Sequence, residues 1–171
     1  METVITGSVT ELAAAGQQAA EELGYEPWLL TTSLNCQAKE AGSFLAAIGR
    51  QYAASGKKMA VLAGGETVVH LHGRGKGGRN QEIALSAADG IAGLDNVAVF
   101  SFGSDGTDGP TDADGGYGDG YTKEKLLEQG LAISDVLDKN DAYHALEKTG
   151  GLLITGATGT NVNDLSVLLI G

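Results

Sequence analysis

Three short segments of this chain are apolar along nearly their whole length, and they restrict the fold more than any other feature. They are KMAVL (residues 58–62), NVAVFSF (residues 96–102) and LSVLLI (residues 165–170). A strand with one face in water alternates apolar and polar residues, whereas a nearly continuous apolar run is typical of a strand buried on both faces. We therefore expect a sheet that carries helices on both sides.

Segments with helical spacing lie between these apolar runs and supply the helices. The sequence SVTE (residues 8–11) forms a capping box before residues 12–23, and Gly24 follows as a stop. Asn35 is expected to cap a second helix, which ends near residue 55. The other expected helices span residues 80–89, 122–129 and 141–148, and Asn140 is expected to cap the last of them.

The remaining strand candidates are residues 28–32, 68–71 and 151–154. Strands that alternate with helices are typical of an α/β fold in which neighbouring strands run parallel. The segment 68–71 follows its predecessor too closely for a helical crossover, so it makes the sheet mixed. The expected fold class is α/β, a layered domain with a mixed, mostly parallel β-sheet flanked by helices.

Composition limits the partners of the chain. The 171 residues suit one domain, residues 1–171, and their net charge of −11 argues against binding to nucleic acid or to an anionic membrane. The single cysteine, Cys36, excludes an intramolecular disulfide and fits a cytoplasmic location. We find no pattern of a signal peptide and no apolar run of transmembrane length. Homo-oligomer formation stays open.

The first of three polar loops is GRGKGGRNQE (residues 73–82), which follows an apolar segment and opens a predicted helix. Its backbone N–H groups, the helix dipole and its cations all favour an anion, and a phosphorylated ligand is the simplest candidate. The glycines at 73, 75 and 78 have the G-x-G-x-x-G spacing of dinucleotide sites, which is a weak signal in a chain with 27 glycines. A solvated turn is the alternative. Glu66 is a speculative partner for Arg79.

The second loop is acidic and reads GSDGTDGPTDADG (residues 103–115). Its carboxylates and hydroxyls suit a hard cation such as magnesium, or a polyhydroxy substrate. A turn held by hydrogen bonds of its own aspartates is the alternative. Asp105 and Asp108 lie nearest the end of the preceding strand, so they are the better candidates for a functional role.

The third loop, TGATGTNVND (residues 155–164), is rich in hydroxyl, amide and glycine groups that can bind phosphate, sugar or carboxylate oxygens. Taken as an isolated segment, the loop is explained better by ordinary turn chemistry. All three loops follow apolar strands, and the carboxyl ends of strands line the ligand crevice of open α/β sheets. The three loops are therefore expected to meet at one edge of the sheet.

Four motifs, in this order along the chain, resemble the MOFRL domain. They are GGET (residues 64–67), GGRNQE (77–82), SDGTDGPTD (104–112) and TGTNVNDL (158–165). The MOFRL domain is the C-terminal domain of the type II glycerate 2-kinases, which are often labelled hydroxypyruvate reductases. Two positions depart from the family pattern: Gln37 stands where the family has a carboxylate, and Lys76 where it has arginine.

The resemblance implies an enzyme that uses ATP and Mg²⁺ to convert D-glycerate to 2-phosphoglycerate. It also implies that the active site lies between this domain and an N-terminal nucleotide-binding domain that is absent from this chain. The chain by itself is then expected to be inactive and to bind a small anionic metabolite, glycerate or phosphoglycerate. Two other hypotheses stay open: a freestanding small-anion-binding or regulatory module, and an NAD(P)H-dependent hydroxypyruvate reductase.

The resemblance also implies roles for individual residues. Arg79 and Asp105 are the expected catalytic residues, with Arg79 on the substrate carboxylate or the transferred phosphate. Asp105 and Asp108 are the expected magnesium ligands. The expected substrate-binding residues are Gly78, Asn80, Glu82, Thr107, Asp108, Thr160, Asn161 and Asn163.

Overall fold

The computed structural model describes residues 7–171, which form six helices and six strands. The helices are α1 (Val9–Glu22), α2 (Ala38–Tyr52), α3 (Arg79–Gly90), α4 (Thr122–Leu127), α5 (Ile133–Asp138) and α6 (Ala142–Thr149). The strands are β1 (Glu26–Leu34), β2 (Met59–Gly65), β3 (Val97–Gly103), β4 (Gly115–Asp119), β5 (Leu152–Leu153) and β6 (Asp164–Ile170).

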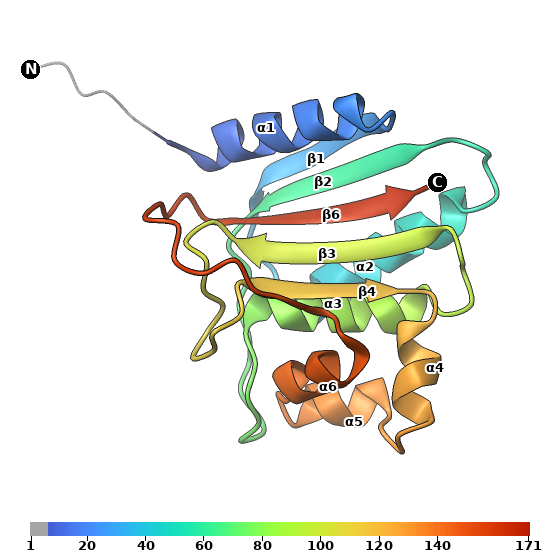
Figure 1. Cartoon of the computed structure of the whole chain (residues 1–171), viewed down its shortest axis with the longest axis vertical. Helices are drawn as coiled ribbons and strands as arrows, with labels where there is room; N and C mark the ends of the chain where they lie inside the picture. The colour runs from blue at the N-terminus through green and yellow to red at the C-terminus, as the bar shows by residue number, and fades with distance from the viewer. Residues whose placement is uncertain (1–6) are drawn as a thin grey trace, which may run out of the picture.

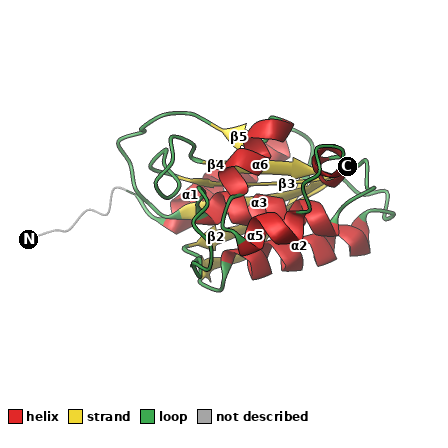
Figure 2. Cartoon of the chain, turned by 90° about the horizontal axis from the view of Figure 1, so that it is seen from below, coloured by secondary structure: helices red, strands yellow, loops and turns green. Residues whose placement is uncertain are grey.

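The strands form one sheet in the order β1-β2-β6-β3-β4-β5. Figure 1 shows this order from β1 to β4, and β5 is labelled in Figure 2. Helices α2 and α3 lie together on one face of the sheet (Figure 2), where they pack on Met59, Val61 and Leu168. Helix α1 covers part of the other face, where Leu62 and Leu165 are buried. Adjacent residues of β2 and β6 thus point to opposite buried faces, as their continuous apolar sequences predict.

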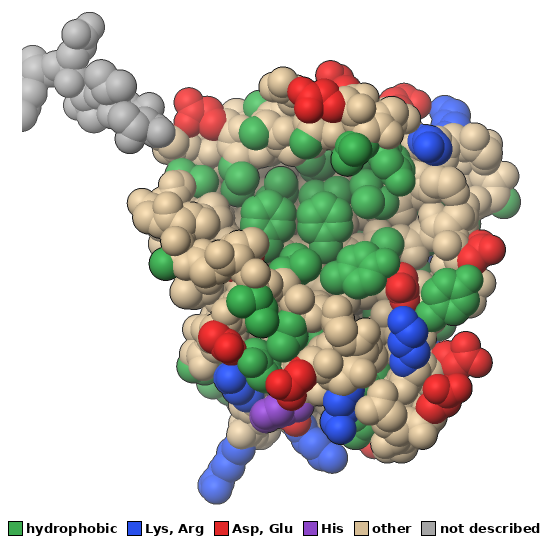
Figure 3. Space-filling view, viewed as in Figure 1, with side chains coloured by type: hydrophobic (Ala, Val, Ile, Leu, Met, Phe, Trp, Pro, Cys, Tyr) green, Lys and Arg blue, Asp and Glu red, His purple; other side chains and the backbone are tan. Residues whose placement is uncertain are grey.

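Helix α1 does not cover the whole of its face of the sheet. Figure 3 shows apolar side chains gathered on this face beside α1. The stacked rings of Phe100 and Phe102, with centroids 6.3 Å apart, pack against the α1 cluster and stay partly accessible. Strand β3 accordingly alternates between buried and half-buried residues, unlike the fully buried β2.

The expected mixed α/β layered sheet is confirmed, but the expected parallel majority is wrong. Only β1 and β2 pair in parallel, and the other four pairs are antiparallel. A parallel neighbour needs a crossover, usually a helix, whereas the loop between β3 and β4 has none. Strand β6, the last in the sequence, inserts between β2 and β3 and runs against both.

The predicted helices are present in the structure, but two of the three predicted N-cap residues are wrong. The Ser8 hydroxyl accepts the N–H of Glu11 at 3.3 Å, so the predicted cap of α1 is confirmed. Asn35 does not cap α2, because the helix begins at Ala38 and its N-cap is Gln37. Asp141, not Asn140, is the N-cap of α6. Helix α5 was not predicted, since its six residues are too few to show a helical period.

One predicted strand is absent from the structure, and one observed strand was not predicted. Residues 68–71 form no strand, and Val68 makes only a single parallel bridge to Gln37. Strand β4 was missed because its sequence, GGYGD, has low strand propensity. Its glycines have a packing reason: a Cβ on Gly118 would lie 2.8 Å from both the Ala84 carbonyl oxygen and the Ala88 Cβ of α3. The helix therefore packs directly on the strand backbone.

Among the described residues, no helix has both the length and the apolar character that a membrane span requires.

We expect Gly118→Ala to lower the free energy of unfolding by about 1–3 kcal/mol, because the added methyl overpacks the contact between α3 and β4. Urea denaturation followed by circular dichroism measures the change. Gly171→Ala is the matched control, since the atom nearest to its added Cβ is 3.4 Å away. Equal stability of the two variants would contradict this account of β4.

Candidate functional site

The three polar loops meet at one edge of the sheet, as expected. Asp164, the first residue of β6, lies opposite Gly65 at the end of β2 and opposite Gly103 at the end of β3. The acidic and third loops are joined directly, because the Ser104 N–H donates to the Asn163 carbonyl at 3.0 Å and the Val162 N–H donates to the Ser104 hydroxyl at 2.7 Å.

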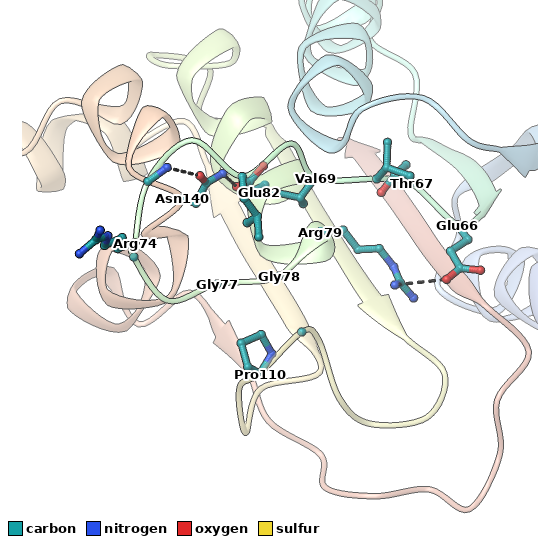
Figure 4. A pocket seen from close by; sticks show the side chains of 15 residues that line it. Glu66, Thr67, Val69, Arg74, Gly77, Gly78, Arg79, Glu82, Pro110 and Asn140 are labelled. Atoms are coloured by element: carbon teal, nitrogen blue, oxygen red, sulfur yellow. Dashed lines mark hydrogen bonds and ion pairs between the residues drawn. The ribbon is translucent and has the colours of Figure 1, made fainter.

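A cavity of about 610 Å³ opens beside this edge (Figure 4). Its wall is formed by the segment that follows β2, the first turns of α3, the Gly109–Pro110 tip of the acidic loop, and Asn140. Of the predicted site residues, Gly78, Arg79 and Glu82 line the cavity. Asp105, Thr107 and the third loop are not part of the wall that the described residues form.

Arg79, in the first turn of α3, is held by carboxylates on two elements. Its Nε and one terminal nitrogen donate to the two oxygens of Asp164 at 2.5 and 3.0 Å. Its other terminal nitrogen lies 3.4 Å from Glu66, so the pairing suggested from sequence is confirmed (Figure 4). The hydrogen bond to Asp164 raises the pKa of the Arg79 guanidinium, which therefore stays a fixed cation beside the cavity.

Asp108 is tied to the helix that carries Arg79. It is buried, and its Oδ1 and Oδ2 accept the backbone N–H groups of Asn80 and Gln81 at 3.2 and 3.0 Å. Gly78, the N-cap of α3, has no side chain to do this, so Asp108 supplies the capping anion from another loop. Burial raises the pKa of the Asp108 carboxyl. Both oxygens are engaged inside the fold, which weighs against the expected roles in metal and substrate binding.

The side chains of Asn80 and Lys76 are also engaged by other groups of the chain. The buried Asn80 amide donates to Asp108 at 3.3 Å and accepts the Ser101 hydroxyl at 2.5 Å, and Asn80 is not among the residues that line the cavity. The Lys76 ammonium lies 3.6 Å from the centre of the Tyr143 ring and 3.6 Å from Asp112. Lys76, one of the cations expected to favour an anion at the basic loop, is thus engaged instead by an aromatic face and a carboxylate.

The other predicted residues form a rim next to the cavity. Asp105 is half-buried and accepts the Thr107 N–H at 3.1 Å, which is the turn chemistry weighed as the alternative. Thr160 and Asn161 are exposed, and Asn163 has a left-handed backbone with φ of 68°. The Thr158 N–H donates to the Asp105 carbonyl at 3.2 Å, so this rim is one connected unit. Its part in substrate binding stays a prediction.

The described residues form no metal cage built from protein side chains alone. Within residues 7–171 no group of three or more histidine, cysteine, aspartate or glutamate side chains is placed to hold a metal ion. Magnesium in nucleotide sites takes one or two carboxylates and completes its shell with water and phosphate. Asp105 is the predicted ligand with the freer carboxylate.

The glycine spacing of the basic loop has a structural explanation. A Cβ on Gly73 would lie 2.1 Å from the Lys139 carbonyl oxygen, and one on Gly75 would lie 2.5 Å from the Asp141 Cβ. Both glycines therefore let the loop pack against the turn between α5 and α6. They give no independent support for a dinucleotide site.

Sequence reasoning missed two residues of the site. Asp164 closes the TGTNVND loop and orients Arg79, but its partner lies 85 residues away along the chain. Asn140 lines the cavity and binds the basic loop, although its sequence context predicts only a helix cap. Asp164 could have been found because a charged residue at the start of a buried strand needs a partner. No feature of the sequence indicated that Asn140 belongs to the site.

The comparisons with known proteins, by sequence and by structure, agree with one another. The MOFRL family matches residues 59–164. The D-glycerate 2-kinase of Thermotoga maritima is 47% identical over 99% of this chain and 42% of its own length. The glycerate 2-kinase of Pyrococcus horikoshii is 46% identical over 88% of this chain and 35% of its own. The crystal structure of the Thermotoga maritima glycerate kinase superposes with a TM-score of 0.96, at 48% identity, over 99% of this chain and 42% of that one. This chain thus spans about two fifths of the length of these relatives.

We expect Asp108→Ala to lower the free energy of unfolding by about 2–4 kcal/mol, because it leaves two buried N–H groups of α3 without an acceptor. Asp105→Ala, in the same loop, should change it by less than about 1 kcal/mol. Urea denaturation of both variants makes the comparison. Equal losses would contradict the division of the two aspartates into an internal cap and a freer rim residue.

Burial raises the pKa of the Glu82 carboxyl, so the folded chain keeps a proton there that the unfolded chain has already lost. Stability from this group therefore falls as pH rises from the ordinary glutamate pKa through the raised one. We expect Glu82→Gln to be more stable than the wild type at pH 7 and to lose that advantage toward pH 4. Urea denaturation across this range tests it, with Glu128→Gln as the exposed control. A gap that stays constant with pH would contradict the assignment.

Proposed function

The chain belongs to the MOFRL family, and from this membership we propose that it is the substrate-site domain of an ATP-dependent glycerate 2-kinase, which converts D-glycerate to 2-phosphoglycerate. In this proposal residues 1–171 act as a single domain. The nucleotide-binding domain is a separate, N-terminal part of the enzyme, and the chain by itself is inactive.

The observation that carries the proposal is the anion cradle on the cavity wall. The Arg79 guanidinium is fixed there by Asp164. Gly77, Gly78 and Arg79 line the same cavity, and their backbone N–H groups have no acceptor among residues 7–171. Consecutive N–H groups beside a guanidinium bind a carboxylate or a phosphate oxygen. Glycerate carries the first group, and its phosphorylated product carries both.

Binding of the anion changes the partners of Arg79. Glu66 is the more exposed of its two carboxylates, and it contacts only one terminal nitrogen. An incoming anion replaces Glu66 at that nitrogen, while Asp164 continues to hold the rest of the guanidinium. Substrate charge is then neutralised by a group that needs no reorientation, which is the form of electrostatic stabilisation that phosphoryl transfer relies on. Asp105 and the rim of Thr107, Thr160, Asn161 and Asn163 would orient the hydroxyl groups.

We assign ATP and Mg²⁺ to the complete enzyme. ATP supplies the transferred phosphoryl group, and magnesium neutralises its charge. The described residues contain no group of three or more histidine, cysteine, aspartate or glutamate side chains placed to hold a metal ion, and Asp105 is the carboxylate that we expect this chain to contribute to a shared site.

A freestanding small-anion-binding module is the second candidate, because the cradle lies entirely within this chain.

A chimeric enzyme distinguishes the kinase domain from the freestanding module. This chain replaces the segment that it matches in the Thermotoga maritima kinase, and a coupled assay follows 2-phosphoglycerate formation from D-glycerate and ATP. The kinase proposal expects activity in the folded chimera and none in this chain alone. A folded but inactive chimera, with 2-phosphoglycerate binding to this chain by calorimetry, favours the module. Oxidation of NADH by hydroxypyruvate would instead indicate a reductase.

We expect Arg79→Ala in the chimera to lower kcat/KM at least 100-fold, which corresponds to about 2.7 kcal/mol of lost transition-state stabilisation. The matched control is Arg50→Ala, which removes an arginine that donates to the Gly90 carbonyl on the helical face. Turnover of Arg79→Ala at the wild-type rate would refute the assigned role.

A further inference from the structure

We propose that Asn140 is a positioning residue: its amide holds residues 70–77, the segment that enters the basic loop and ends just before α3, in the form that presents the anion cradle, and Glu82 anchors that amide on α3. The inference rests on the proposed function for its consequence in catalysis. Its structural part, the hold on the loop, stands separately and is tested separately.

Residues 70–77 form no helix or strand that would hold them in place. Their hydrogen bonds go instead to the turn between α5 and α6 and to the start of α6. The Gly75 N–H donates to the Lys139 carbonyl at 2.9 Å, and the Lys76 N–H donates to the Asp141 carboxylate at 2.9 Å. The Lys76 carbonyl accepts the Tyr143 N–H at 3.0 Å. The position of the loop is therefore set by a distant part of the chain.

Asn140 is at the centre of this attachment. Its Oδ1 accepts the backbone N–H groups of His72 and Gly73 at 2.8 and 2.9 Å. Its Nδ2 donates to the His70 carbonyl at 3.3 Å and to a Glu82 carboxylate oxygen at 2.9 Å (Figure 4). A side-chain amide has two donors and two acceptor sites, so its full capacity is used.

The geometry at position 140 demands this residue type. Asn140 has a left-handed backbone with φ of 53°, a region in which asparagine is enriched among residues other than glycine. Its side chain is buried, so unmet donors or acceptors there would be destabilising. Aspartate keeps the acceptor but loses both donors, and it would place a second carboxylate against Glu82. Asn140→Asp is therefore the informative substitution.

The charges around this pair set its pH dependence. Lys39 from α2 and His72 from the loop favour the ionised Glu82, whereas Asp108 from the acidic loop opposes it. Two adjacent carboxylates cannot both ionise cheaply, so Asn140→Asp retains a shared proton at low pH and loses it as pH rises. The loop should then be held at pH 5.5 and released at pH 8.

The double variant Asn140→Asp/Glu82→Gln exchanges the amide and the carboxylate between the two positions. An amide donor at position 82 then faces a carboxylate at position 140, which still accepts from His72 and Gly73. This variant is expected to recover most of the attachment at pH 8. A merely space-filling role of Asn140 predicts no such recovery.

The primary test measures amide hydrogen exchange of this chain without ligand, at pH 5.5 and pH 8 after correction for the intrinsic rate. We expect Asn140→Asp to raise exchange at His72, Gly73 and Gly75 at least tenfold at pH 8, less at pH 5.5, and to leave α3 protected. The double variant should return to within about threefold of the wild type. Asn96→Asp, which alters a remote amide that donates to the Ala53 carbonyl, is the control and should leave the loop unchanged.

Wild-type exchange of the loop in Asn140→Asp at pH 8 would overturn the proposal, as would equal loss of protection in the double variant. If the single variant fails to fold, a folded double variant with a protected loop supports the proposal, and an unprotected loop refutes it.

In the chimera, Asn140→Asp should raise KM for D-glycerate at least tenfold at pH 8 with partial recovery at pH 6. Loss of activity in Arg79→Ala together with an unaffected loop in Asn140→Asp would sink this inference and leave the proposed function standing.

Discussion

The insertion of β6 between β2 and β3 is the constraint on which the candidate site depends. It brings Asp164 to the point where β2 and β3 both end, opposite Gly65 and Gly103. A carboxylate at the start of a buried strand needs a partner, and Arg79 of α3 supplies two hydrogen bonds. The same pairing fixes the guanidinium at the cavity. Fold stability and the proposed recognition of the ligand therefore share one ion pair.

The N-terminus of α3 illustrates how the fold uses its own charges. A free helix N-terminus attracts an anion, and the sequence suggests a ligand there. In the structure Asp108 already occupies that role through Asn80 and Gln81. The N–H groups left without an acceptor among the described residues are those of Gly77, Gly78 and Arg79, at and just before the start of the helix. The proposed ligand site therefore precedes, along the chain, the N–H groups of Asn80 and Gln81 that Asp108 occupies.

Much of the architecture could be predicted because the signals are local. Apolar runs predict the buried strands β2, β3 and β6, and the Ser8 capping box predicts α1. Strand β4 could not be predicted, because its glycines reflect contact with α3 and not strand propensity. Strand direction also escaped prediction, since it depends on whether a loop carries a crossover. Arg79 was found from its motif, whereas Asp164 and Asn140 depend on long-range pairing that a single sequence does not display.

Two different parts of the fold hold the cavity wall in place. Arg79 is fixed by the sheet edge through Asp164, while residues 70–76 are fixed by the turn between α5 and α6. Glu82 and the Gly77–Gly78 step connect the two. Helices α5 and α6 belong to a smaller apolar cluster than the one under α2 and α3. Because loosening of that smaller cluster would release the loop but leave the guanidinium in place, the charge of the site and its shape can vary independently of each other.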